Sequence, residues 1–186
     1  MYRLVELEEI VRISPGMLRR DFDQVVKETL KGECEGRIYK SIGMILFIEA
    51  VDRVGDGEIV PGDGSVYQKT HFRALVFSPE DQEIVEGRIS QIAEFGAFLN
   101  FGPLDGLIHV SQVMDDFVDV DMINGRIVGK NSKKTLRVDD ICRARIVSLS
   151  LNENDPKLSR IGLTMRQPGL GALQWLEEKK EEVKSG

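Results

Sequence analysis

The segment of residues 86–112, EGRISQIAEFGAFLNFGPLDGLIHVSQ, constrains the fold of this chain more than any other. Alternating apolar residues predict one strand before and one strand after a turn that holds Phe95 and Phe98. Gly96 stands between the two rings, and a glycine lets a second backbone approach closely. We interpret the two phenylalanines as a stacking platform, which suits unpaired bases because every base has a π-face.

Five strands are expected in the second part of the chain, residues 80–186. Their predicted bounds are 84–92, 97–101, 107–109, 141–151 and 161–165. This number of short strands predicts an all-β, five-stranded OB barrel. The excursion at 112–140 is expected to be a solvated loop or a short helix. Residues 170–184 predict an amphipathic helix that caps the barrel or meets a partner.

The first part, residues 1–79, predicts an α+β domain with an antiparallel sheet and one helix on its face. Period-2 alternation predicts strands at 2–13, 36–40, 44–54 and 66–77. Ser14 and Pro15 predict a helix N-terminus, and Gly32 predicts its end.

A glycine-rich loop, GDGEIVPGDGS at residues 55–65, separates the last two of these strands. It lacks the Gly-Lys-Ser/Thr ending of a phosphate-binding loop. Asp-Gly pairs favour a tight hairpin turn, which is one interpretation. The other is a projecting loop that docks on a partner, because two Gly-Asp-Gly units and a proline exceed the needs of one turn.

The charge of the chain is unevenly distributed. The net charge is −6, yet residues 125–166 hold ten Lys or Arg and four Asp or Glu. A local basic face can bind phosphates on an acidic protein. Arg143 and Arg145 share one strand face in this segment and, with Arg160, are candidate phosphate contacts; the alternative is a solvated surface of mixed charge.

Several classes of function are disfavoured by the sequence. No apolar run approaches the ~20 residues that span a bilayer, and Cys34 and Cys142 have no CxxC partner, so we expect no membrane contact and a cytoplasmic protein. No catalytic triad or carboxylate pair can be assembled, so we expect no enzyme activity of the chain by itself and no cofactor. Four aspartates, at Asp115, Asp116, Asp119 and Asp121, do not match a calcium loop, and no metal is expected.

Four motifs taken in order carry a resemblance over almost the whole chain. They are VRISP, PGDGSVYQKTHFRALVF, EFGAF with GPLDGLIHVSQ, and IGLTMRQPGLGAL. The third resembles the RNA-binding domain first named in ribosomal protein S-one. Together they resemble the E-prime family of archaeal DNA-directed RNA polymerase subunits, the larger stalk subunits, whose eukaryotic counterpart is subunit seven of RNA polymerase II.

This resemblance implies a non-catalytic stalk subunit that assists transcription initiation and elongation. The first domain would be a truncated ribonucleoprotein-like domain that docks on core RNA polymerase through its tip and pairs with the smaller, F-type stalk subunit. The implied docking residues are Gly55, Ile59, Val60, Pro61, Gly62 and Gly64.

The barrel of this family would bind nascent single-stranded RNA. Phe95 and Phe98 would stack bases, His109 would lie on the same face, and Arg160 would hold phosphate. The family often has an acid where this chain has Ser150 or Asn152. Two alternatives stay open: a translation or RNA-decay factor with the same barrel, and a nuclease with an appended barrel.

Overall fold

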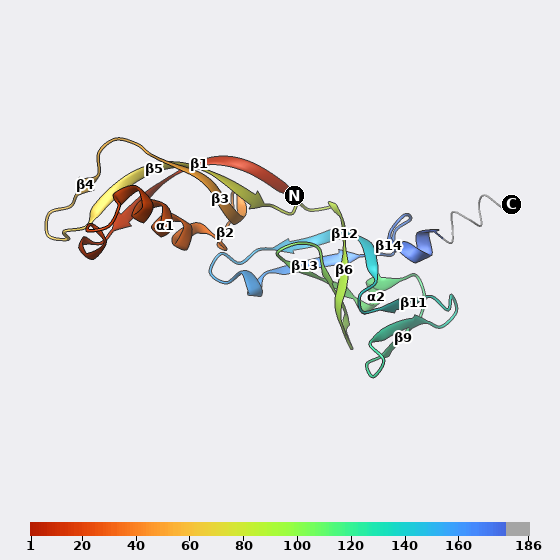
Figure 1. Cartoon of the computed structure of the whole chain (residues 1–186). Helices are drawn as coiled ribbons and strands as arrows, with labels where there is room; N and C mark the ends of the chain where they lie inside the picture. The colour runs from red at the N-terminus through yellow and green to blue at the C-terminus, as the bar shows by residue number, and fades with distance from the viewer. Residues whose placement is uncertain (178–186) are drawn as a thin grey trace. The chain divides into compact units, whose positions relative to one another are not determined.

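The structure is a computed structural model that describes residues 1–177 (Figure 1). The chain divides into two compact units. Met1–Ser78 and Glu153–Pro156 form the first, and Pro79–Asn152 with residues 157–177 forms the second. Within residues 1–177, no helix is both long and apolar enough to cross a membrane.

The first unit is built on an antiparallel sheet with the strand order β1-β5-β3-β2. Its strands are β1 (Tyr2–Ile13), β2 (Ile38–Tyr39), β3 (Gly43–Arg53) and β5 (Val66–Phe77). A short strand, β4 (Glu58–Ile59), pairs with the start of β5. β1 pairs with β5 along its full length, from Tyr2 opposite Phe77 to Ile13 opposite Val66. The sheet therefore confirms the predicted antiparallel α+β domain.

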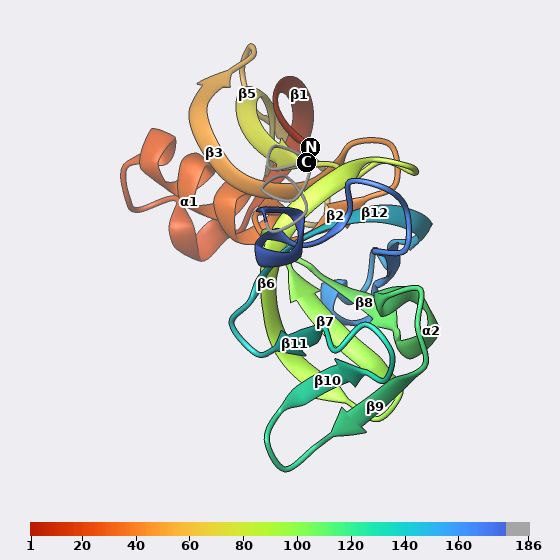
Figure 2. The same cartoon turned by 90° about the vertical axis from the view of Figure 1, so that its right-hand side faces the viewer.

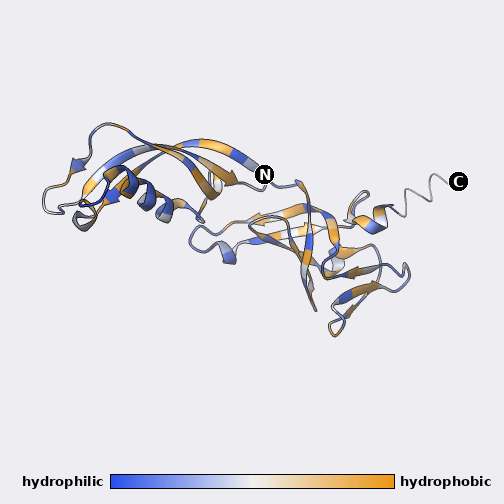
Figure 3. Ribbon diagram, in the orientation of Figure 1, coloured by the Kyte–Doolittle hydropathy of each residue, from blue (hydrophilic) through white to orange (hydrophobic). Residues whose placement is uncertain are grey.

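One helix, α1 (Phe22–Cys34), packs on one face of this sheet. Val25, Val26 and Leu30 on the helix are at most 1% exposed, and they pack against Val11 and Ile13 of β1 and their neighbours on β3 and β5. The rest of the helix is largely hydrophilic in Figure 3. This is the pattern of a helix that buries one stripe and leaves the other side to solvent.

Both predicted ends of the helix were wrong. Pro15–Met17 forms a separate 3-10 turn, and α1 begins after Asp21, whose side chain accepts a hydrogen bond from the Gln24 backbone N–H (3.0 Å). This is the N-cap contact that Ser14 was expected to make. The helix passes through Gly32 and ends at Cys34, because a glycine inside a helix costs only about 1 kcal/mol and packing of the buried stripe outweighs it.

The second unit is the predicted closed five-stranded OB barrel. Its strands are β6 (Ile84–Ala93), β7 (Gly96–Asn100), β8 (Asp105–His109), β12 (Ile141–Ser150) and β13 (Arg160–Thr164). The order is β13-β8-β7-β6-β12, and a further pairing of β13 with β12 closes the barrel. β13 runs parallel to β8, with Gly162 opposite Leu107. A short 3-10 turn, Pro156–Leu158, precedes β13.

The excursion at residues 112–140 is a small antiparallel sheet, so the predicted loop or helix was wrong. After the short helix α2 (Val110–Val113) come β9 (Val118–Asp121), β10 (Arg126–Gly129) and β11 (Thr135–Arg137), in the order β11-β10-β9 (Figure 2). We call this the inserted sheet. Ile127 and Leu136 are fully buried in it, so packing of these two side chains stabilises a sheet that otherwise carries many charged residues.

The end of the described chain packs on the barrel. β14 (Gly171–Ala172) pairs with β12, and residues 173–177 are helical. Leu170 and Trp175 are each 8% exposed, and the Trp175 indole N–H donates to the Thr135 carbonyl (3.3 Å). These two residues therefore cap the domain. The rest of the predicted helix, to residue 184, lies outside the described residues.

Candidate nucleic-acid interface

The Phe95–Phe98 pair lies on the outer surface of the barrel. The ring centroids are 6.0 Å apart and the planes meet at 88°, an edge-to-face contact. Ala97 and Leu99 are fully buried on the inner face of β7, so strand alternation turns Phe98 outward. Phe95, in the turn before β7, is 51% exposed and Phe98 is half-buried. Neither ring is part of the barrel core, and a base has access to both.

Gly96 brings the next strand directly beneath this pair. A Cβ at this position would overlap the carbonyl oxygen of Ile108 on β8. The Val110 N–H also donates to the carbonyl of Phe95 (2.8 Å), which ties the aromatic turn to the start of α2. This close backbone approach is the role that the sequence predicted for Gly96.

His109 lies at the end of β8, opposite Gly96 of β7. Its side chain is exposed and caps α2: Nδ1 lies 2.8 Å from the Ser111 hydroxyl and accepts the Ser111 backbone N–H at 3.3 Å. The ring is thus held beside the aromatic turn by its own helix cap. His109 and the Phe95–Phe98 pair therefore share one edge of the outer surface.

Arg160 shares the outer face with Phe98. Phe98 faces Leu107 on β8, and Leu107 faces Gly162 on β13. Arg160 is two residues before Gly162 on β13. From Phe98, it is therefore two strands away across the sheet and two residues further along the strand direction, a distance of about 12 Å. Asp105 and Asn100 stand in the same row, joined by a 2.8 Å hydrogen bond. An exposed cation and an aromatic pair on one face form a surface that single-stranded nucleic acid can follow.

Arg143 and Arg145 lie on β12. Arg143 faces Glu86 on β6, five residues from Gln91, which faces Phe98, so Arg143 is roughly 16 Å from that ring along the sheet. Arg145 faces Thr164 on β13, and the parallel pairing of β13 with β8 places Thr164 beside His109, so Arg145 and His109 are two strand spacings apart, about 10 Å. Arg143 already forms an ion pair with Glu86 (2.7 Å), and the Nε of Arg145 is buried without a hydrogen-bond partner. The structure brings Phe95, Phe98 and His109 together. It places Arg160 about 12 Å from Phe98 and Arg145 about 10 Å from His109, and it leaves Arg143 apart from them.

Three of the four aspartates, Asp115, Asp116 and Asp121, have separate partners. Asp116 accepts backbone N–H groups from Ser132 (2.7 Å) and Asn131 (2.9 Å), and these hydrogen bonds lower its pKa to about 2. Asp121 accepts from Asn124 and Arg126, which also lowers its pKa to about 2. Among residues 1–177, no group of three or more acids, histidines or cysteines is placed to hold a metal.

We call the glycine-rich loop at residues 55–65 the tip loop. Hydrogen bonds hold its base, and its end exposes apolar side chains. Asp63 accepts two hydrogen bonds from Arg12 (2.7 and 3.1 Å) and one from the Tyr67 hydroxyl (2.7 Å). These contacts lower the pKa of Asp63 to about 2. Beyond them, Ile59 and Val60 are 67% and 47% exposed. Pro61 is exposed, and Gly55, Gly62 and Gly64 adopt positive φ angles that make the bends possible.

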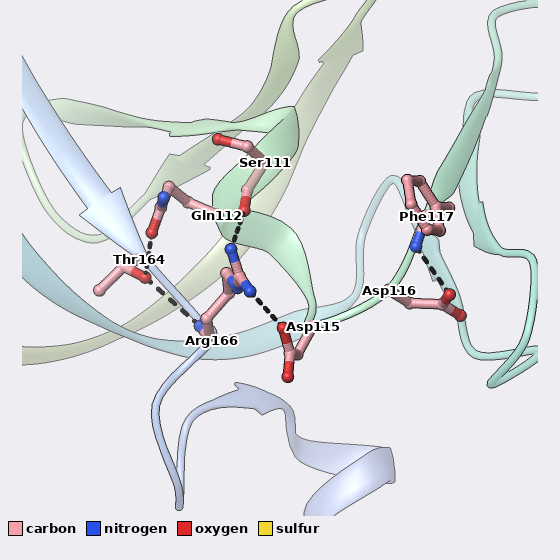
Figure 4. Close-up of polar contacts among 7 residues, drawn as sticks. All are labelled: Ser111, Gln112, Asp115, Asp116, Phe117, Thr164 and Arg166. Atoms are coloured by element: carbon pink, nitrogen blue, oxygen red, sulfur yellow. Dashed lines mark hydrogen bonds and ion pairs between the residues drawn. The ribbon is translucent and has the colours of Figure 1, made fainter.

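Arg166 and Phe117 are two exposed residues that the sequence did not single out as a site. Arg166 follows β13; its guanidinium donates to the Ser111 carbonyl (3.4 Å) and pairs with Asp115 (Figure 4). Phe117 precedes β9 and is 78% exposed. No signal for Phe117 was available, because its exposure depends on the inserted sheet.

Comparisons with known proteins agree with this architecture in both units. Residues 8–64 match the "SHS2 domain found in N terminus of Rpb7p/Rpc25p/MJ0397", and residues 78–161 match the "S1 RNA binding domain". The chain is 38% identical over 181 residues to DNA-directed RNA polymerase subunit Rpo7 of Saccharolobus shibatae, covering 97% of this chain and all of the relative.

The chain belongs to the Rpo7 family of DNA-directed RNA polymerase subunits. The Rpo7 relative of Sulfolobus acidocaldarius is 37% identical over 96% of each chain. The resemblance to the larger stalk subunits is confirmed, and so are the two predicted fold classes. As a member of the Rpo7 family, the chain is a subunit that associates with the RNA polymerase core.

The barrel unit by itself is also similar to proteins outside the Rpo7 family. Ribonuclease R of Buchnera aphidicola is 33% identical over 79 residues, which are 41% of this chain and 11% of that protein. Such a match concerns a shared module, so the Rpo7 relationship rests on the full-length relatives.

Proposed function

We propose that this Rpo7-family chain is a non-catalytic stalk subunit that docks on core polymerase through its tip, pairs with the smaller, F-type stalk subunit and binds nascent single-stranded RNA on its barrel. In this role it assists initiation and elongation. One observation carries the proposal: an exposed aromatic pair lies on a barrel attached to a unit with a fastened, apolar-ended loop.

The proposed docking on core polymerase is supported by the tip loop. Ile59 and Val60 contribute nothing to the buried core of their own unit. Arg12, Asp63 and Tyr67 hold the base of the loop in one arrangement, so little conformational entropy is lost when the loop enters a cleft. Apolar side chains on a rigid projection are typical anchors of a protein interface.

Pairing with the F-type stalk subunit rests on uncovered sheet surface in the first unit. β1 is a twelve-residue edge strand, and Leu4 and Ile10 on it are 67% and 59% exposed. Long edge strands with exposed apolar residues are usually covered by a partner, because they otherwise template aggregation. Leu170 and Trp175, which were also expected to meet a partner or cap the domain, are buried within the barrel unit and leave this sheet as the candidate surface.

The RNA-binding part is tested by replacing Phe95 and Phe98 together with alanine. Each lost base stack is worth ~1–3 kcal/mol, so the affinity for a single-stranded oligouridylate should fall at least tenfold by fluorescence anisotropy. Phe47→Ala, a half-exposed phenylalanine on β3, is the matched control. A correctly folded double variant that binds RNA as tightly as the parent would refute the stacking role.

The alternative, a translation or RNA-decay factor, draws on the shared barrel and on the ribonuclease R match. This alternative assigns no function to the tip loop. Co-purification of a tagged chain discriminates between the two: polymerase subunits should be recovered under the stalk proposal and absent under the alternative. A nuclease is tested by a magnesium-dependent cleavage assay, in which we expect no cleavage.

A further inference from the structure

A groove of about 590 Å³ lies between α2, Arg166 just beyond β13, and the start of the inserted sheet. Its walls combine apolar side chains with a few polar ones, as ligand sites commonly do. The groove is lined by Val110, Ser111, Asp115, Phe117, Asn131 and Arg166, among other residues. Figure 4 shows Arg166 and Asp115 on one side and Phe117 on the other.

Phe117 presents its ring on a fixed backbone. Its N–H donates to Asp116 (2.7 Å) and its carbonyl accepts from Lys130 (2.8 Å). Asp116 is itself held by Asn131 and Ser132. The side chain remains 78% exposed, so the inserted sheet positions a large aromatic ring without using it for packing.

The cation that lines the groove together with this ring is Arg166. Arg166 stands on the other wall, held by the exposed carboxylate of Asp115 and by the Ser111 carbonyl. Because surface ion pairs are weak, an incoming phosphate can replace Asp115 as the partner of Arg166.

The groove continues from the aromatic pair of the barrel. Val110, in the groove wall, donates its N–H to the carbonyl of Phe95, and Ser111 is hydrogen-bonded to His109. We propose that the groove binds one further nucleotide of a single-stranded RNA whose neighbouring bases stack on Phe95 and Phe98, with its base on Phe117 and its phosphate at Arg166. This inference rests on the RNA-binding function proposed above.

The acids of the groove define its electrostatics. The Asp116 carboxylate accepts hydrogen bonds from three backbone N–H groups and from the Asn131 side-chain amide. Of the two carboxylates that line the groove, Asp115 is the one that pairs with Arg166, the residue proposed to bind the RNA phosphate. Asp115 therefore competes with RNA, whereas Arg166 contributes to its binding, and their substitutions should have opposite effects.

The experiment compares two oligouridylates on the full chain: one of about 2 nucleotides, which covers only Phe95 and Phe98, and one of about 12 nucleotides, within the range of lengths that one OB barrel binds. Phe117→Ala should weaken the longer RNA at least about fivefold, the lower end for one lost stack, and leave the shorter one unchanged. Phe117→Tyr should restore binding. Ile123→Ala, at a 96% exposed position of the inserted sheet, is the control and should have no effect.

The charge variants supply the second readout. Arg166→Gln should weaken the longer RNA and Asp115→Asn should tighten it; equal effects of the same sign would mean that the ion pair is only structural and would overturn the inference. If Phe117→Ala leaves the longer RNA unchanged while the Phe95 and Phe98 double variant weakens it, RNA binding stands and the groove assignment falls. Loss of a protein partner with unchanged RNA affinity would assign the groove to that protein instead. If the parent binds neither RNA, the proposed function itself is wrong.

Discussion

At the scale of single residues, one carboxylate organises the inserted sheet. Asp116 joins the residue before β9 to the turn after β10 through backbone N–H groups of Phe117, Asn131 and Ser132, all between 2.7 and 2.9 Å. Hydrogen bonds to an ionised acceptor are stronger than neutral ones. The low pKa of Asp116, about 2, is the consequence of this arrangement.

The low pKa of Asp116 predicts how the stability of the fold depends on pH. A carboxyl whose pKa is lowered by folding stabilises the native state above its unfolded pKa of about 4. That stabilisation is lost as the pH falls from about 4 through about 2. Asp116→Asn should therefore unfold at lower urea than the parent at pH 7, and the two midpoints should converge as the pH approaches 2.

Asp119→Asn, in the same sheet, is the control and should track the parent across the range. A difference between Asp116→Asn and the parent that stays constant from pH 7 to 2 would show that the carboxylate charge is not what stabilises the turn.

At the scale of elements, strand alternation was predictable from sequence, whereas the start of the helix and contacts between distant residues were not. The bounds of β1 and β5 were predicted to the residue, because apolar residues recur at alternate positions within each strand, such as Val5 and Leu7 in β1 and Phe72 and Ala74 in β5. The start of α1 was missed because Ser14-Pro15 opens a 3-10 turn instead.

The inserted sheet was missed for a related reason. Its turn depends on Asp116, fifteen residues away from Asn131, and no local pattern encodes that contact. For the candidate site, the aromatic pair was visible as a motif, whereas the groove at Phe117 and Arg166 exists only through tertiary placement.

The tip loop provides the prediction at this scale. Asp63→Ala removes the acceptor of Arg12 and Tyr67, so the loop should gain freedom. Amide hydrogen exchange in residues 54–65 should accelerate at least several-fold, while exchange in the barrel strands stays the same. Asp56→Ala, on the same loop, is the control. Unchanged exchange in the Asp63 variant would mean that β4 alone fixes the loop.

At the scale of the whole molecule, each of the two units carries exposed features to which we assign a separate proposed role. One unit contributes the fastened tip and an uncovered sheet; the other contributes the aromatic pair and the groove. Membership in the Rpo7 family places both surfaces in a polymerase complex. Each should therefore be removable without loss of the other.

The most direct test is recovery of core polymerase by the chain paired with the F-type stalk subunit, comparing the parent with the double variant Ile59→Ser and Val60→Ser. Deleting the loop would also remove β4 and Asp63, whereas these two exposed side chains can be changed without touching the core. The account predicts that recovery of core polymerase falls at least about tenfold, the equivalent of ~1.4 kcal/mol, while RNA affinity and pairing with the smaller stalk protein stay at parental values. Equal recovery of core polymerase by the parent and the variant would contradict it.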